Sequence, residues 1–290
     1  KQNGSEKIEG STDDYKVNVE GAAITLVYVD GTKGWIVTDT GNSDDANAAE
    51  FICATGGTIT NTPTCRIHTF TGPGTFTVNK VSATTPARND VSYIVVAGGG
   101  SGGARNSGNG NGGGGGGGFR EDKSPLTPYT ASPLDGAPAI TLAAGSYPIV
   151  VGAGGAAVTQ QASPELQGND GSVSTFDSVT SAGGGGGGGG GNNVPLTNGR
   201  PGGSGGIPSG VTGGTGNSPP TSPAQGFNGG IGGNAPSNGG AGGGGGATEV
   251  GENQASAPTS GRGGAGATTS ISNSPIGYSG GGGGSGGGSL

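Results

Sequence analysis

The sequence is poor in the residues on which most protein chemistry depends. In 290 residues it has one His, two Cys, one Trp and no Met, and only 11% of its residues are charged. A structural zinc site needs about four Cys or His ligands, so this composition argues against a metal site. A net charge of −7 without a basic cluster argues against nucleic acid as a partner.

Long apolar runs are missing as well. No stretch approaches the ~18 consecutive apolar residues of a membrane span, so we expect no membrane insertion. The first residues show no signal-peptide pattern. Because the chain starts at Lys1 and has no Met, we expect that residues preceding it were removed or left out.

Catalytic groups are sparse. His68 lies in an alternating, strand-like run on the same face as Phe70. That position is typical of a structural histidine rather than an acid–base catalyst. The carboxylates lie in linkers and loops and form no pair across a substrate. The sequence therefore predicts a protein that is not an enzyme and has no cofactor.

The two cysteines, Cys53 and Cys65, lie 12 positions apart and flank one loop. A disulfide between them would close that loop. The alternative is a pair of buried thiols in a protein assembled in a reducing cytosol. The sequence leaves both open.

Glycine is what the chain has in abundance. Of 75 glycines, 65 lie in the 193 residues from Gly98 onward. Runs of five or more occupy residues 112–118, 183–191, 242–246 and 280–284. They follow no Gly-X-Y period, which excludes collagen. A disordered low-complexity tail and a bundle of polyglycine II helices remain as explanations.

The bundle follows from the chemistry of a chain without side chains. Such a run has nothing apolar to bury, and ordering it costs about 1–2 kcal/mol per residue. In polyproline II geometry, with about three residues per turn and ~3.1 Å rise, all N–H and C=O groups point outward. Neighbouring helices can satisfy these groups only by close approach, which glycine allows on every side. Strand patterns between the runs, and apolar residues at their ends such as Phe119 and Tyr278, favour the bundle over disorder.

The N-terminal part predicts a β-hairpin. Residues 23–29 and 35–38 read as strands joined by a turn at 30–34. The hairpin is apolar on both faces, and an isolated two-stranded hairpin is marginal. We therefore expect residues 1–45 to form a linker and an oligomerising β collar.

The rest of the chain predicts two further parts. Strand patterns in residues 46–97 indicate a small β-sandwich-like platform. Residues 98–290 form the glycine-rich polyglycine II domain, with inserted strands at 139–152 and 173–176. The predicted fold class is thus mainly β and irregular, with essentially no α-helix.

Recognition should lie in the loops, because the glycine runs themselves are monotonous. Aromatic and Arg residues are the usual anchors of recognition surfaces, and rigid scaffolds commonly display functional loops. The alternative is that Phe119, Phe227 and Tyr278 plug the ends of the bundle. The loops at 119–138, 192–201, 217–231 and 249–262 supply the receptor-binding candidates Phe119, Arg120, Tyr129, Arg200, Phe227 and Arg262.

Several stretches resemble the glycine-rich domain of tailed-phage tail fibres. The order of these short motifs, rather than any one of them, makes the resemblance specific. Residues 24–37 also resemble a hairpin that often precedes this domain in phage structural proteins. The motifs are RIHTFTGPGTFTV at 66–78, YIVVAGGG at 93–100, YPIVVGAGG at 147–155, GNDGSVSTF at 168–176 and GYSGGGGG at 277–284.

The resemblance implies a virion protein that attaches a phage to its host. It is similar to the glycine-rich adhesin tips of T-even-like phages, in which distal loops of a polyglycine II sandwich contact the host surface. The implied partners are a host cell-surface receptor, protein or glycan, and other virion fibre or tail proteins. The attached hairpin implies a fibre end fused to its stem, hence a homotrimer. The alternatives are a structural fibre without a specific ligand and an ice-binding polyglycine II protein, against which the irregular loops argue.

Overall fold

The computed structural model consists of short β-strands and extended glycine-rich segments. It describes residues 6–8, 10–12, 24–39, 51–83, 85–104, 111–159, 167–189, 198–202, 213–232, 240–255 and 259–286. Its regular structure is β, apart from a four-residue 3-10 turn at Pro86–Asn89, so the predicted fold class is confirmed. Two compact units result, one of Lys1–Ala54, Val78–Asn89 and Leu142–Ala144, the other of Thr55–Thr77, Asp90–Thr141 and Gly145–Leu290.

The first unit contains the predicted hairpin. Strand β1 (Thr25–Asp30) pairs antiparallel with β2 (Gly34–Asp39), with Tyr28 opposite Trp35. The Asp30 carboxylate accepts the backbone N–H groups of Thr32 and Lys33 at 2.7 Å, which fixes the turn. These two hydrogen bonds stabilise the charged form and lower the pKa of Asp30.

The hairpin is held by the segment before it. The Trp35 indole N–H donates to the Glu6 carboxylate at 2.7 Å, and the Trp35 backbone N–H donates to the Lys7 carbonyl at 2.8 Å. Gly34 has a φ of +72°, and a Cβ there would lie 2.0 Å from the Lys7 oxygen. Only glycine satisfies both conditions at this turn.

A five-stranded sheet in the order β13–β12–β11–β6–β3 and four two-stranded sheets make up the rest of the β structure. The five-stranded sheet combines strands from either side of residue 97. The two-stranded sheets pair β4 (Thr58–Asn61) with β5 (Arg66–Thr69), β7 (Asp90–Val91) with β10 (Ile140–Thr141), β8 (Tyr93–Val96) with β9 (Phe119–Asp122), and β14 (Ala267–Thr269) with β15 (Ile276–Tyr278). The five-stranded sheet consists of β3 (Cys53–Thr55), β6 (Gly74–Lys80), β11 (Gly145–Val150), β12 (Ser174–Phe176) and β13 (Val179–Ser181).

Aromatic rings form the core beside this sheet. Phe76 and Phe176 meet edge to face with centroids 6.0 Å apart, and Tyr93 contacts Phe176 at 5.9 Å. His68 stacks edge-on against Phe76 at 4.9 Å, and its Nδ1 donates to the Gly56 carbonyl at 2.8 Å. His68 is therefore a structural residue, as its position in the sequence predicts.

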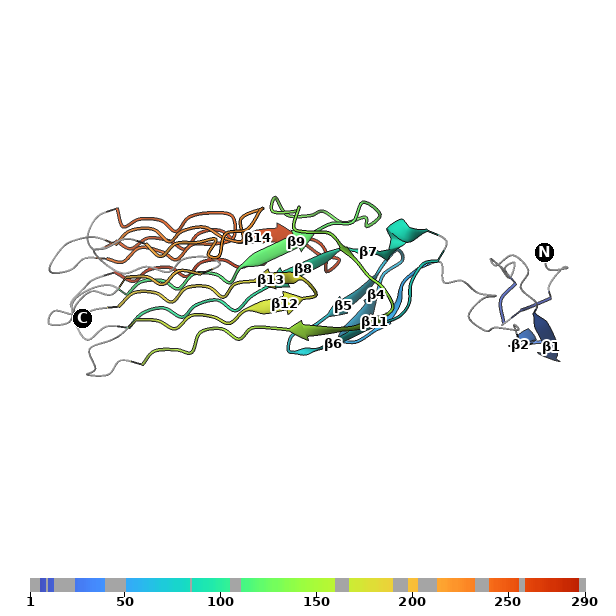
Figure 1. The fold of residues 1–290 in the computed structure, drawn as a ribbon. Coiled ribbons are helices and arrows are strands. Elements are labelled where there is room, and N and C mark those ends of the chain that lie inside the picture. The colour runs from blue at the N-terminus through green and yellow to red at the C-terminus, as the bar shows by residue number, and fades with distance from the viewer. Residues whose placement is uncertain are drawn as a thin grey trace. The chain divides into compact units, whose positions relative to one another are not determined.

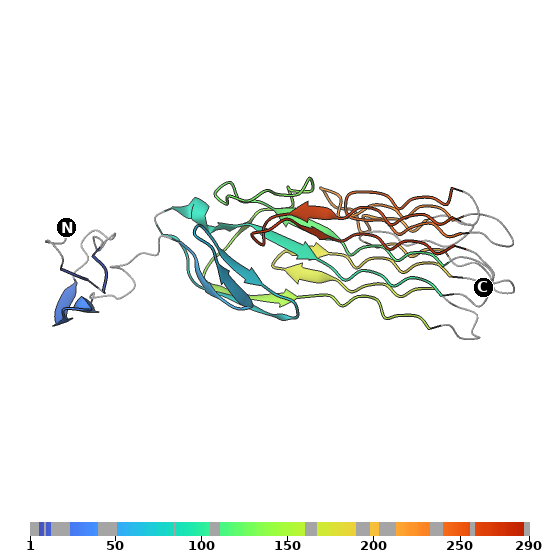
Figure 2. The ribbon, with the colours of Figure 1, turned by 180° about the vertical axis from the view of Figure 1, so that it is seen from behind.

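The second unit contains the polyglycine II bundle. Glycine-rich segments leave the ends of β8, β9, β12 and β13 and run side by side away from these strands (Figures 1 and 2). Every residue of 112–118, 182–189 and 240–247 is buried. These three runs form the interior of the bundle, where a core of side chains would normally lie.

The hydrogen bonds of the bundle repeat every third residue. Along segment 111–118, Gly112, Gly115 and Gly118 donate to carbonyls of segment 182–189, at distances of 2.8–3.0 Å. Gly113 and Gly116 donate in another direction, to the carbonyls of Gly242 and Gly245. This is the period of a polyproline II helix. The backbone N–H groups of one such helix can therefore donate to two neighbouring helices.

Three strand assignments made from the sequence are wrong. Phe119–Asp122, expected in a loop, is strand β9, and its four residues pair with β8 in register. Strand signals were expected to end near Gly183, yet β14 and β15 form a hairpin with Thr268 opposite Gly277.

Over the described ranges, no helix has the length and apolar character needed to cross a membrane.

Candidate functional site

Phe119, the first recognition candidate, is a core residue. Its side chain is 1% exposed and packs in a cluster with Ala247 and Ala267, against which Leu134 and Tyr278 also lie. The position follows from β9, because Phe119 directly ends a glycine run and pairs with Val96 of β8. Phe119 therefore closes the strand-side end of the bundle, with its side chain in the core.

Arg120 is also buried, at 5% exposure, and it fixes a loop. Its guanidinium donates to the carbonyl of Pro223 at 2.8 Å and to that of Ser222 at 3.2 Å. Burial disfavours the charged form and lowers the pKa of Arg120. Sequence reasoning expected a receptor contact here, but the guanidinium is already occupied by backbone carbonyls.

Hydrogen bonds of the Asn217 and Gln225 side-chain amides fix the loop that Arg120 contacts. The Asn217 side-chain oxygen accepts N–H groups from Thr221 at 3.0 Å and Gln225 at 3.1 Å, and Asn217 has a φ of +50°. Gln225 is 1% exposed, and its side-chain oxygen accepts the Ala182 N–H at 2.8 Å. Residues 217–225 thus form a rigid cap over the strand-side end of the bundle.

Glu121 is a buried carboxylate with structural partners. It is 0% exposed and accepts the Ser132 N–H at 2.8 Å and the Thr269 hydroxyl at 2.6 Å. These bonds connect β9 to the loop 123–137 and to β14. The half-buried Tyr129 lies nearby, and burial together with the Glu121 charge raises the pKa of its hydroxyl. Tyr129 is therefore a neutral packing residue more than an exposed anchor.

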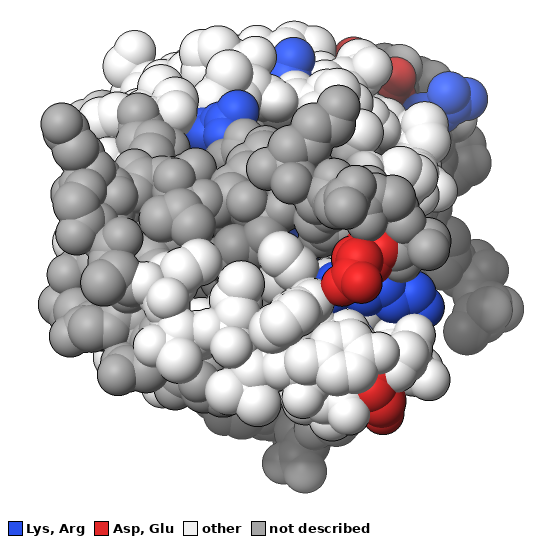
Figure 3. Space-filling view, turned by 90° about the vertical axis from the view of Figure 1, so that its right-hand side faces the viewer, with Lys and Arg blue, Asp and Glu red and all other residues white. Residues whose placement is uncertain are grey.

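Three of the candidates do present side chains to solvent. Phe227 is 37% exposed. Arg200 and Arg262 are exposed, and Arg200 pairs with Asp170 at 2.9 Å across two glycine-rich segments. The charged side chains drawn in Figure 3 are few and stand among uncharged ones. The face drawn in Figure 3 thus shows scattered charged side chains and no dense charged patch among the residues described there.

Phe227 has apolar neighbours that sequence reasoning did not single out as binding residues. Ile231 is 51% and Val250 is 49% exposed. Their segments are adjacent, because Gly251 donates to the Asn228 carbonyl at 3.0 Å and Gln254 to the Ile231 carbonyl at 2.8 Å. The sequence could have indicated them, because Ile231 and Val250 are apolar residues within loops that were predicted to bind a partner.

At the other end of the bundle, described residues that flank several undescribed intervals lie close together. Gly103 donates to Gly112 and Gly112 to Gly188, so the described residues that flank 105–110 and 190–197 lie together. The Gln167 side-chain amide donates to the Asn198 carbonyl, which adds the flank of 160–166. Gln254 and Ile231 pair beside the flanks of 233–239 and 256–258. The predicted loops 192–201 and 249–262 fall partly on these intervals, and there they lie outside the described residues.

The cysteines and the acidic residues form neither a disulfide nor a metal site among the described residues. Cys53 and Cys65 are free thiols, the first exposed and the second half-buried, so the disulfide does not form in this structure. Asp122 lies near Asp135 and Asp90, and its pKa is raised by partial burial and then by these two charges. Across the described ranges, no three His, Cys, Asp or Glu residues gather as metal ligands would.

A comparison with protein families gives one match. The model of a glycine-rich domain matches residues 71–290, about three quarters of the chain. The chain belongs to this glycine-rich domain family. The matched region begins at the turn before β6 and includes the whole bundle.

Two further comparisons give no match. No curated protein matches the chain. No solved structure matches it either. The family membership therefore shows a glycine-rich domain and assigns no function.

Proposed function

We propose that this chain is a non-enzymatic attachment protein of a tailed phage, located in the virion as a tail fibre or adhesin. It would bind a host cell-surface receptor, protein or glycan, through loops displayed by the polyglycine II bundle. The sequence motifs that resemble phage tail fibres motivate the phage assignment. The glycine-rich family supports the scaffold alone.

The observation that carries the proposal is the gathering of chain connections at one end of the bundle. The bundle interior consists of backbone, with buried glycine at every position from 112 to 118. Such a scaffold has little chemistry with which to discriminate partners. The described residues that flank five chain intervals lie at its far end, and rigid scaffolds commonly carry recognition residues in the loops they connect.

The described candidates differ in exposure, and Phe227 closely follows the strand-side cap 217–225 whereas Arg200 lies near the far end. Phe119 and Arg120 stabilise the strand-side end, whereas Arg200, Phe227 and Arg262 keep exposed side chains on the bundle. We propose Arg200 and Arg262 as flanking contacts of the receptor surface. Phe227, with Ile231 and Val250, would supply apolar contact area.

Loop replacement tests the proposal. In two variants, residues 192–197 or 233–239 are replaced by Gly/Ser sequence of equal length, and fluorescently labelled protein is incubated with a panel of bacterial strains. We expect at least one variant to lose about tenfold or more of its retention on a binding strain, with an unchanged circular-dichroism spectrum. The matched control is Leu126→Ser, a 59%-exposed position in the strand-side loop, which should bind as the parent does.

The structural-fibre alternative predicts different results. A fibre without a ligand would bind none of the strains, or would bind them equally with and without its loops. An ice-binding protein would show thermal hysteresis in solution. Either result would reject the attachment function, while leaving the bundle architecture unaffected.

A further inference from the structure

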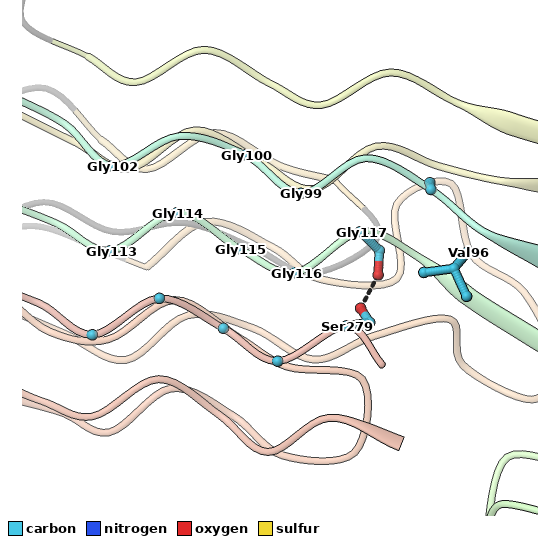
Figure 4. A pocket seen from close by; sticks show the side chains of 15 residues that line it. Val96, Gly99, Gly100, Gly102, Gly113, Gly114, Gly115, Gly116, Gly117 and Ser279 are labelled. Carbon is cyan, nitrogen blue, oxygen red and sulfur yellow. Dashed lines mark hydrogen bonds between the residues drawn. The ribbon is translucent and has the colours of Figure 1, made fainter. Parts of the chain in front are cut away.

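A groove with a volume of about 500 Å³ runs along the side of the polyglycine II bundle. Its walls are segments 97–104 and 279–286, and segment 111–118 forms its floor. Figure 4 shows Gly99–Gly102 along one wall and Gly113–Gly117 beside it, with Val96 at the strand-side end. The Ser279 hydroxyl donates to the Gly117 carbonyl at that same end. The groove is thus a channel lined almost wholly by peptide backbone.

The N–H groups that face this groove lack hydrogen-bond partners. On the floor, Gly113 and Gly116 donate to the neighbouring glycine run, but no described residue accepts the N–H of Gly114 or Gly117. On each wall, two N–H groups three residues apart also have no acceptor among the described residues. The six N–H groups without a partner in the described chain belong to Gly99, Gly102, Gly114, Gly117, Gly280 and Gly283.

The six donors differ in burial, because Gly102, Gly280 and Gly283 of the walls are exposed whereas the two donors of the floor are not. Gly114 and Gly117 are buried residues, and an unpaired buried N–H is uncommon in folded proteins. Three rows of donors, each with a three-residue period, converge on one channel. Buried N–H groups without an acceptor in the described chain also occur at four residues that do not line the groove, Gly185, Gly188, Gly242 and Gly245.

The groove also has room where the packed helices have none. A Cβ built on Gly184 would lie 2.3 Å from the nearest backbone atom, whereas one on Gly99 would lie 3.5 Å away. The corresponding distances are 3.4 Å at Gly102, 3.9 Å at Gly280 and 4.0 Å at Gly283. The channel therefore has the character of an unfilled helix position in the bundle.

We propose that this groove binds an extended, glycine-rich segment of a partner protein as one more polyglycine II strand. Its carbonyl oxygens would accept the unpaired N–H groups of the floor and both walls. A polyproline II strand repeats every three residues, about 9.3 Å along its axis, and the donor rows repeat in the same way. The occupant would extend the interhelix packing that already joins segments 97–104, 111–118 and 279–286.

The chemistry of the walls excludes other shapes of occupant. An α-helix with side chains is about 10–12 Å wide and keeps its own carbonyls bonded. A β-strand directs its carbonyls to two opposite sides with a period of two, which does not match three converging rows. The lining includes no charged side chain, so a charged polymer would find no counter-charge. This assignment does not depend on the host-attachment function.

The test uses the full chain and a defined probe. The probe is a heptaglycine peptide with one lysine at each end for solubility, and the matching alanine peptide is its control. Binding is followed by amide NMR shifts and by hydrogen exchange. We expect saturable binding of the glycine peptide with a Kd of about 1 mM or tighter, and shifted, slowed N–H signals at Gly114 and Gly117. The alanine peptide should not bind, because its methyl groups meet the backbone walls.

Two groove variants and one matched control make the test specific. Gly102→Ala with Gly283→Ala, and separately Gly99→Ala with Gly280→Ala, add methyl groups to the segments that line the groove, at positions where a Cβ meets no atom closer than 3.4 Å. Each pair should weaken peptide binding at least about tenfold without lowering Tm. Gly154→Ala lies outside the groove, with its nearest neighbour 3.6 Å from the new Cβ, and should leave binding unchanged.

Three results would overturn the proposal. The first is the absence of saturable binding to the parent protein, and the second is binding that both groove pairs leave intact. The third is an oligomer of the parent that the groove pairs dissociate, since that would assign the groove to a second copy of this chain. Loss of host-cell retention in the loop variants bears on the attachment function alone, so the two proposals can fail separately.

Discussion

At the scale of single residues, the absence of side chains allows the glycine segments of this protein to pack closely. In the packed runs a side chain would collide with a neighbouring backbone, as at Gly183, where a Cβ would lie 1.8 Å from the Gly171 carbonyl oxygen. Peptide groups fill the space that Leu or Val would fill elsewhere. The net value of each hydrogen bond is about 0.5–1.5 kcal/mol, so stability depends on making many of them together.

Gly183→Ala tests this packing. The added methyl group forces the backbone of two segments apart, and overpacking of this kind costs about 1–3 kcal/mol or more. We therefore expect a free energy of unfolding lower by at least about 2 kcal/mol, measured by urea denaturation. Gly154→Ala is the control. Its Cβ has room and restricts the unfolded chain, so it should be neutral or stabilising by about 0.4–1 kcal/mol. Equal effects of the two substitutions would contradict the close-packed bundle.

Residue roles were the least predictable feature of the sequence. Phe119 and Arg120 are residue types that are common in binding surfaces, yet their side chains are only 1% and 5% exposed. Their burial depends on Ala267 and on the Pro223 carbonyl, which are distant in sequence. Composition shows which residues can anchor a partner, whereas only the tertiary contacts show which of them are already used.

At the scale of elements, short apolar or alternating runs predicted several of the strands. Strands β5 and β6 lie where apolar and polar residues alternate, whereas β1, β2 and β8 lie in short apolar runs. β9, with the sequence FRED, carries three charged residues and no such pattern. It forms because β8 offers its backbone and because the Glu121 carboxylate finds donors in Ser132 and Thr269.

The end of β9 gives a prediction about pH. Partial burial and the neighbours Asp135 and Asp90 raise the pKa of Asp122 in the folded protein above 3.8. The folded state therefore holds this proton to higher pH than the unfolded state does, so the Asp122 contribution to stability falls as pH rises through that window. We expect Asp122→Asn to raise Tm by a few degrees at pH 7, with the gain vanishing below the unfolded pKa. Thermal denaturation across pH 3–7 measures this, and a gain independent of pH would contradict it.

At the scale of the whole molecule, the N-terminal hairpin stands out by its exposed apolar side chains. Tyr28 is 52%, Val29 is 53% and Trp35 is 37% exposed. Large exposed apolar groups mark interaction surfaces. We propose, with the attachment function, that three copies of the chain bury these side chains together as a homotrimer.

Sedimentation equilibrium tests that proposal. The full chain of 27.0 kDa should sediment at about three times its own mass. Val29→Asp places a charge on the exposed face and should shift the population to monomer, because an unpaired charge is costly to bury. Thr32→Ser, in the exposed turn of the same hairpin, is the matched control and should leave the mass unchanged. A monomeric parent chain would reject the trimer.

The sequence by itself determined the fold class and the glycine bundle. Runs without side chains are ordered only when neighbouring backbones pair with them, and the strand patterns between the runs place them in a folded domain. Tertiary structure alone decided which N–H groups are paired. Gly113 and Gly114 are identical in sequence, yet one donates to Gly242 and the other faces the groove. The difference is the direction in which each peptide group points, and only the arrangement of the helices fixes what lies there.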